Sequence, residues 1–349
     1  MHAVLDSPLV ARPLAAADRL RLRWLHVLGP AARPIVRLRE LRVALVFSGL
    51  ILVALAGALI APLWLLLLAP IVWGVPHLVA DLRYLVVRSG YHRRTRLWWL
   101  AGGPLLWVAV GGELVWGFVA AAIAAMLARA GLVRRLVAVA VLAVAGAIVV
   151  ALDRAGDLVF SYVHNFLALG FWWLWRPRTG RIHLLPLALL VAATAFLLSP
   201  AALVFAHWLG SFAWFPAGAG VEHQLWRLAP GVDPELGLRL VLLFCFSQSL
   251  HYGVWLHLVP DEDRERATPP TFRASYALLR RDLGDTGLVV AALLAVFIAG
   301  WAAFDLAAAN LGYFRMARFH GHLELVAGAL LLLEGGRARQ GKGCTRVRP

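Results

Sequence analysis

Long apolar runs separated by clusters of arginine are the feature that most constrains this chain. A helix needs about 20 apolar residues to cross the hydrocarbon layer of a membrane, and runs of that length recur along the sequence. Because 61% of the residues are hydrophobic, a soluble globular fold is excluded. The sequence therefore predicts an all-α, polytopic transmembrane helical bundle.

The arginines predict the topology. Cytoplasmic loops of membrane proteins concentrate basic residues, and about ten spans with both termini cytoplasmic place the arginine-rich loops on that side. The formal charge of +15 then belongs to these loops, and we expect no nucleic-acid partner. The predicted spans are 42–60, 63–87, 97–112, 114–130, 135–152, 158–175, 182–206, 236–258, 286–308 and 312–334.

Basic segments flank the predicted transmembrane domain of residues 42–334. Residues 1–41 carry arginines interleaved with Leu, Val and Trp24, which is typical of a partly amphipathic arm. We expect this arm to lie on the cytoplasmic face, where anionic lipid attracts it. Residues 335–349 form a basic C-terminal tail.

A histidine and an aspartate lie four residues apart in the second predicted span, His77 and Asp81. This spacing places both on one face of a helix, at a depth where ionisable groups are costly and often functional. Both side chains could bind one metal ion, or Asp81 could orient the His77 imidazole. A buried pair that only fixes helix packing is the alternative.

Three later spans also carry histidines. Gln248 and His251 are three residues apart and share one helix face, whereas His320 and His322 point in nearly opposite directions and Glu324 shares the face of His320. Imidazole and carboxylate donors without thiolate suit iron, copper or zinc better than magnesium or calcium. The predicted metal ligands are His77, His164, His251, His320 and His322, and the predicted catalytic carboxylates are Asp81 and Glu324.

The expected depths of these histidines divide them into two groups. Counted along the spans at about 1.5 Å per residue, His77 and His251 fall toward the inner half of the membrane. His164, His320 and His322 fall toward the outer half. One shared site and two separate sites therefore both remain open.

The run Gly74-Val75-Pro76-His77-x-x-x-Asp81 resembles the Gly-x-Pro-His-x-x-x-Asp signature of the bacterial Brp/Blh family. Members of that family are polytopic, iron-dependent enzymes that cleave beta-carotene to retinal. The resemblance implies iron bound by His77, His164, His251 and one of His320 or His322. It also implies a lipophilic, carotenoid-like substrate and a place in the bacterial cytoplasmic membrane.

A second resemblance rests on His320-Gly321-His322-Leu323, which is similar to the His-x-His of a late helix in heme-copper oxidases and nitric-oxide reductases. There the two histidines face opposite ways and bind different hemes, so heme becomes an alternative cofactor. A proton- or ion-coupled transporter is a further alternative, because intramembrane His, Asp and Glu can relay protons. Our leading prediction is a histidine-ligated iron oxygenase acting on a lipophilic substrate.

Overall fold

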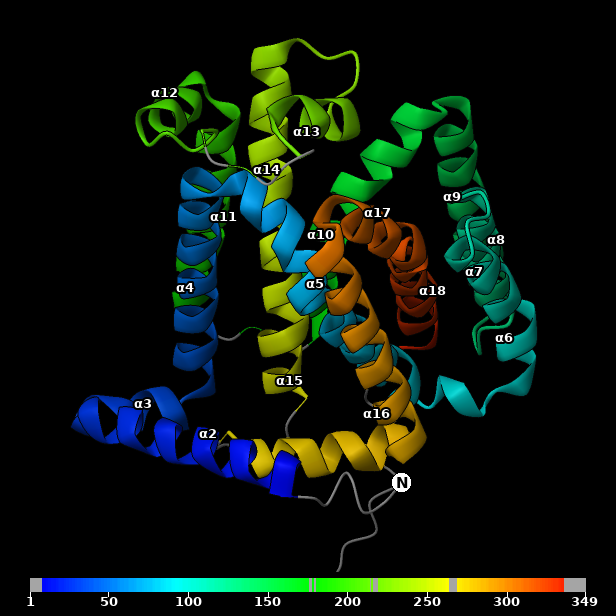
Figure 1. Ribbon diagram of the computed structural model, residues 1–349. Helices are drawn as coiled ribbons and strands as arrows, with labels where there is room; N and C mark the ends of the chain where they lie inside the picture. The colour runs from blue at the N-terminus through cyan, green and yellow to red at the C-terminus, as the bar shows by residue number, and fades with distance from the viewer. Residues whose placement is uncertain are drawn as a thin grey trace, which may run out of the picture. The chain divides into compact units, whose positions relative to one another are not determined.

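A computed structural model describes residues 8–175, 178, 180–213, 215, 219–263 and 269–335. Within these ranges all the regular secondary structure is helical and no strand is present, as the sequence predicts (Figure 1). Parts of the predicted basic tail 335–349 and of the loop after the sixth predicted span lie outside the described residues.

Six helices in the described part of the chain are long and apolar enough to cross a membrane. Two of them leave nearly all of their apolar residues at least partly exposed, since only 6% of the most apolar stretch of Leu132–Ala151 and of Phe272–Phe304 is buried within the protein. The six are Arg39–Ile60 (α4), Pro62–Val87 (α5 and its continuation), Leu132–Ala151 (α9), Arg181–Leu198 (ending in α11, Leu184–Leu198), Phe272–Phe304 (α16) and Leu306–Glu334 (α17 and α18).

The predicted count of ten spans is not confirmed. The third predicted span is divided into α6 (Thr95–Leu100) and α7 (Gly102–Ala109), and the fourth forms the 12-residue α8 (Val115–Met126). The sixth and eighth form α10 (Arg154–Trp175) and α14 (Pro234–Gly253). Both helices are long enough to cross a membrane. Their polar residues, including His164 and His251, lower their mean hydropathy, so they are not among the six.

The chain divides into two compact units, each built from separated segments. Unit 1 comprises Met1–His77 and Trp172–Asn310. In unit 1, α4 packs against α14 and α11, and α13 (Val221–Leu228) packs against α14. The buried side chains of this unit include Phe47, Ile51, Trp172, Leu242 and Phe246.

Unit 2 comprises Leu78–Phe171 and Leu311–Pro349. Here α8 packs against α9 and against α18 (Phe319–Glu334). Small side chains on α8 let the helix backbones come close together. Close packing of this kind holds helices together in a membrane, where no hydrophobic effect drives their association. The alanines involved are Ala120, Ala121, Ala124 and Ala125, and they pack in one cluster with Leu323, Val326 and Leu330 of α18.

Helix α16 of unit 1 bends sharply at Gly284, where φ is 73° and ψ is 169°. A positive φ of this kind is readily adopted by glycine alone. Arg280 and Asp285 form an ion pair across the bend, with Nη2 and Oδ2 3.1 Å apart. The bend separates a polar first half from an apolar second half, close to residue 286, where the sequence predicts a span to begin.

The N-terminal arm is helical within the described residues. It forms α2 (Pro8–Val27) and the short α3 (Ala32–Arg37) before α4 begins. Helix α2 packs against α16 within unit 1. In Figure 1 it runs alongside the first half of α16, at a large angle to α4.

Candidate metal centre

Helix α5 (Pro62–Asp81) places His77 and Asp81 one turn apart, as their spacing predicts. Both side chains are completely buried. Pro76 lies directly before His77 inside the helix and cannot donate a backbone hydrogen bond to the carbonyl four residues earlier. A π-helical turn, η2 (Leu82–Val87), follows Asp81 directly. Interruptions of this kind are frequent at functional sites.

Helix α14 (Pro234–Gly253) carries the second histidine of unit 1. His251 is 1% exposed, and Gln248 lies one turn before it on the same helix. The Gln248 side-chain amide donates a hydrogen bond of 3.0 Å to the hydroxyl of Tyr252. This helix also continues into a π-helical turn, η5 (Val254–Leu258). The two histidine-bearing helices therefore share the same local irregularity.

The His77 and His251 rings are brought together within unit 1. Their centroids are 5.3 Å apart and the rings meet edge to face at 75°. The ring of Tyr252 lies 4.7 Å from that of His77. Because imidazole nitrogens bind transition metals at about 2.0–2.1 Å, two rings at this separation are close enough to share one ion.

Two carboxylates are brought together within unit 2, Asp81 and Glu324. Both are almost fully buried, and they lie close enough for their charges to interact. Neither Asp81 oxygen has a hydrogen-bond partner among the described residues. Burying two neighbouring negative charges is unfavourable unless a cation or a shared proton compensates them. The pair therefore suits a site that holds a positive charge.

Unit 2 holds the second histidine pair, His164 from α10 and His320 from α18. Their ring centroids are 5.0 Å apart, at 78°. The Nδ1 atom of His320 hydrogen-bonds to the carbonyl of Ala317. A carbonyl can only accept, so Nδ1 carries the proton and Nε2 is the nitrogen that can bind a metal. Glu324 lies one turn beyond His320 on α18.

His322 lies in an aromatic pocket of unit 2. Its ring stacks on Phe160 at 4.3 Å and meets the edge of Phe118 at 5.3 Å. Its Nδ1 donates a hydrogen bond of 3.3 Å to the carbonyl of Arg318, and its buried Nε2 has no hydrogen-bond partner among the described residues. A Cβ added to Gly117 of α8 would lie 2.1 Å from this ring. Only glycine at that position leaves room for the imidazole.

The structure brings two histidines together within each unit. His77 lies with His251 in unit 1, while His164 lies with His320 in unit 2. The ring of His322 contacts the rings of Phe118 and Phe160, also in unit 2.

Several residues around these histidines carry no metal-ligand signal in the sequence. The four-residue spacing of Gln248 and Tyr252 on α14 indicates a contact between them, but nothing near Gly117, Phe118 or Phe160 indicates that they enclose His322. These three residues are far from His322 along the chain. Only the packing of α8 and α10 around α18 reveals them.

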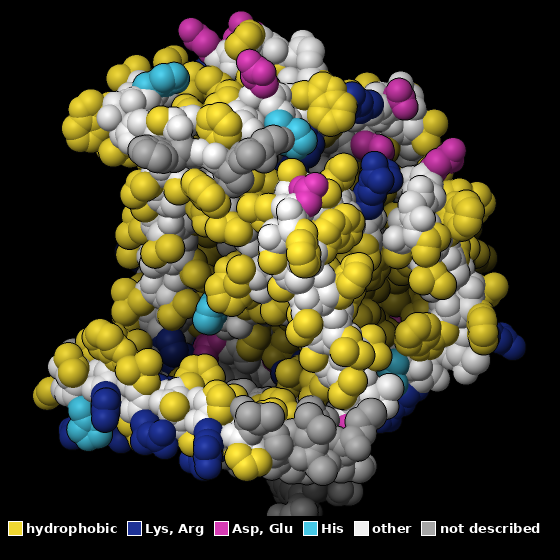
Figure 2. All heavy atoms as spheres, viewed as in Figure 1, with side chains coloured by type: hydrophobic (Ala, Val, Ile, Leu, Met, Phe, Trp, Pro, Cys, Tyr) yellow, Lys and Arg dark blue, Asp and Glu magenta, His cyan; other side chains and the backbone are white. Residues whose placement is uncertain are grey.

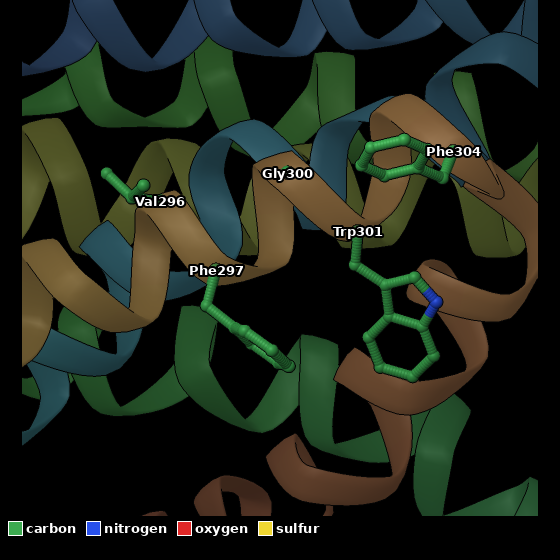
Figure 3. A pocket seen from close by; sticks show the side chains of 5 residues that line it. All are labelled: Val296, Phe297, Gly300, Trp301 and Phe304. Carbon is green, nitrogen blue, oxygen red and sulfur yellow. The ribbon is translucent and has the colours of Figure 1, made fainter.

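An apolar pocket lies on the second half of α16 in unit 1. It is lined by Val296, Phe297, Gly300, Trp301 and Phe304. Figure 3 shows Phe297 and Trp301 projecting from the same side of the helix. No histidine or carboxylate lines this pocket, so its chemistry suits hydrocarbon and not a metal ion.

Protein-family models, curated proteins and solved structures contain no match to this chain. The resemblance of residues 74–81 to the Brp/Blh signature therefore remains an expectation from the sequence.

Proposed function

We propose that the chain is a polytopic protein of the bacterial cytoplasmic membrane, with about ten spans and both termini cytoplasmic, that binds iron and oxidises a lipophilic substrate with dioxygen. The observation that carries this proposal is the buried contact between His77 and His251, whose ring centroids are 5.3 Å apart. Ionisable side chains at membrane depth are costly, and they mark functional sites more often than packing sites.

We assign the candidate ligands by type. The imidazoles are His77 and His251 in unit 1 and His164 and His320 in unit 2. The carboxylates are Asp81 and Glu324, which lie together in unit 2. These residues offer imidazole and carboxylate, the donor combination that non-heme iron uses in oxygenases. His322 is the alternative ligand on α18.

The chain's own residues suit an ion at these positions. The buried Asp81 oxygens without hydrogen-bond partners among the described residues can be compensated by a cation. The Nδ1 bond of His320 directs its Nε2 away from its own backbone. Iron held by these residues would supply redox chemistry with dioxygen. Tyr252, held by Gln248, limits how the His77 ring can turn.

A lipophilic substrate follows from the surroundings of the proposed centre. His77, His251 and His322 are at most 1% exposed, so a polar substrate that reached them would lose its hydration. Candidate spans such as α9 and α16 expose apolar side chains along most of their length, which suits substrates that partition into lipid. The Brp/Blh resemblance narrows this class to carotenoids.

Metal analysis of the purified protein together with its optical spectrum tests this function. We expect stoichiometric iron and no Soret band. Protein that purifies without any stoichiometric metal contradicts a metal centre. Zinc in place of iron would retain the centre but contradict the oxygenase, copper would contradict the choice of iron, and a Soret band would establish heme instead.

A further inference from the structure

We propose that α2 is a lipid-recognition helix that binds the phosphates of anionic phospholipids through a stripe formed by Arg12, Arg19 and Arg23. This proposal goes beyond the metal centre and does not depend on it. It rests on the three distinct faces of α2 within unit 1, each with its own chemistry.

The first face holds α2 against α16. Asp18 accepts a hydrogen bond of 2.6 Å from the backbone N–H of Phe272 and one of 3.0 Å from Nε of Arg273. Three residues further along α2, Arg21 donates to the carbonyls of Pro269 and Pro270, at 3.1 Å and 2.6 Å. These bonds fix the rotation of α2 about its own axis, so the remaining faces have defined directions.

The second face is basic. Arg12, Arg19 and Arg23 are exposed and are spaced by seven and four residues, which aligns them along one side of a helix. His26, three residues beyond Arg23, extends the same line. Figure 2 shows a row of basic side chains along the lower edge of α2. Arg21 is excluded from this row because it bonds to the segment before α16.

The third face is apolar and lies beside the basic stripe. Leu20, Trp24 and Val27 follow one another at four and three residues, and 56%, 61% and 76% of their surfaces are exposed. A helix that exposes an apolar face next to a basic one lies in the interfacial region of a membrane. There Trp sits at headgroup level and arginine reaches the phosphates.

Charge complementarity identifies the partner as an anionic leaflet. The exposed part of α2 carries three aligned arginines, and its carboxylate, Asp18, faces α16 and is 6% exposed. Each basic residue near an anionic surface contributes about 1 kcal/mol of attraction, or about fivefold in affinity. Three aligned arginines therefore suffice to distinguish anionic from zwitterionic lipid.

The test uses the full-length protein in a neutral detergent and two short-chain lipids, dioctanoyl phosphatidylglycerol and dioctanoyl phosphatidylcholine. Binding of each lipid is measured by native mass spectrometry at low salt. We compare the wild type with the triple variant R12Q/R19Q/R23Q. The matched control is R93Q/R96Q/R315Q, which removes the same charge from exposed arginines outside α2.

We expect the α2 triple variant to bind phosphatidylglycerol at least about tenfold more weakly, with phosphatidylcholine binding and metal content unchanged. The control triple variant should stay within about twofold of the wild type. If the α2 variant does not elute as a folded protein, the three single variants replace it, each with an expected loss of several fold. Wild-type affinity in the α2 variants, or an equal loss in the control, would overturn the proposal.

Discussion

The rings of His77 and His251 meet edge to face, with their centroids 5.3 Å apart, from two helices that lie far apart in the sequence. Each side chain is at most 1% exposed. An imidazole pair buried this deeply is unfavourable unless hydrogen bonds or a metal ion satisfy its nitrogens. This relationship is the basis of the proposed centre, and several predictions depend on it or on the packing around it.

Replacing Asp81 separates a ligand role from a packing role. Asp81→Asn removes one of two neighbouring buried carboxylates, so we expect lower iron content, because the centre loses a negatively charged oxygen donor. The matched control is Asp157→Asn, whose carboxylate lies 3.6 Å from Arg318 and is 43% exposed. Equal iron content in both variants would remove Asp81 from the centre.

Gly117→Ala tests the pocket around His322. The new Cβ would lie 2.1 Å from the imidazole, so His322 or α8 must shift, at a cost of about 1–3 kcal/mol. We expect a lower melting temperature than that of Gly103→Ala, which adds the same atom where nothing lies within 4 Å. Two variants that melt together would show that α8 does not pack on His322 as described.

The stability of unit 1 should depend strongly on Glu262. It is fully buried and forms ion pairs with Arg39 and Arg178. Glu262→Gln leaves the Arg178 guanidinium, 7% exposed, without its carboxylate, and we expect a loss of about 3–5 kcal/mol of stability.

The control for Glu262 is Asp157→Asn. Asp157 lies 3.6 Å from Arg318 and its side chain is 43% exposed, so a loss of at most about 1 kcal/mol is expected. Chemical denaturation in detergent measures both variants. A loss for Glu262→Gln no larger than that of the control contradicts the buried ion cluster.

The contact between α2 and α16 should depend on acid pH. Burial alone would raise the pKa of Asp18, but hydrogen bonds from the Phe272 N–H and from Arg273 outweigh it and lower the pKa below 3.8. A carboxyl whose pKa is lower in the folded state stabilises that state above its ordinary pKa and loses this contribution as pH falls through the folded pKa. Proteolysis of α2 should therefore increase only below about pH 4.

Asp18→Asn is the control for this pH dependence. The amide cannot titrate. Proteolysis of α2 in this variant should therefore be the same at about pH 5 as at about pH 3, one unit above and one unit below the ordinary carboxyl pKa. A wild-type profile that matches the variant across this range would show that Asp18 does not hold α2.

Periodicity and hydropathy predict much of this fold. The all-helical class and the single turn between His77 and Asp81 both follow from local patterns. Local patterns suffice because helix formation depends on neighbouring residues.

The count of ten spans is a part of the sequence prediction that the structure does not confirm. Gly102, Gly103 and Pro104 interrupt the third predicted span, where α6 ends and α7 begins. The residues enclosing His322 could not be predicted, because Phe118 and Phe160 reach it through contacts between helices far apart in the chain. Hydropathy says which faces are apolar, but it does not say which apolar faces meet.

The iron content of matched histidine variants tests the central claim most directly. His77→Ala and His251→Ala are compared with His207→Ala, which removes an exposed histidine whose Nδ1 bonds to the Leu203 carbonyl. We predict stoichiometric iron in the wild type and in His207→Ala, and a loss of about tenfold or more in each of the other two. Full iron content in both His77→Ala and His251→Ala would contradict the proposed centre.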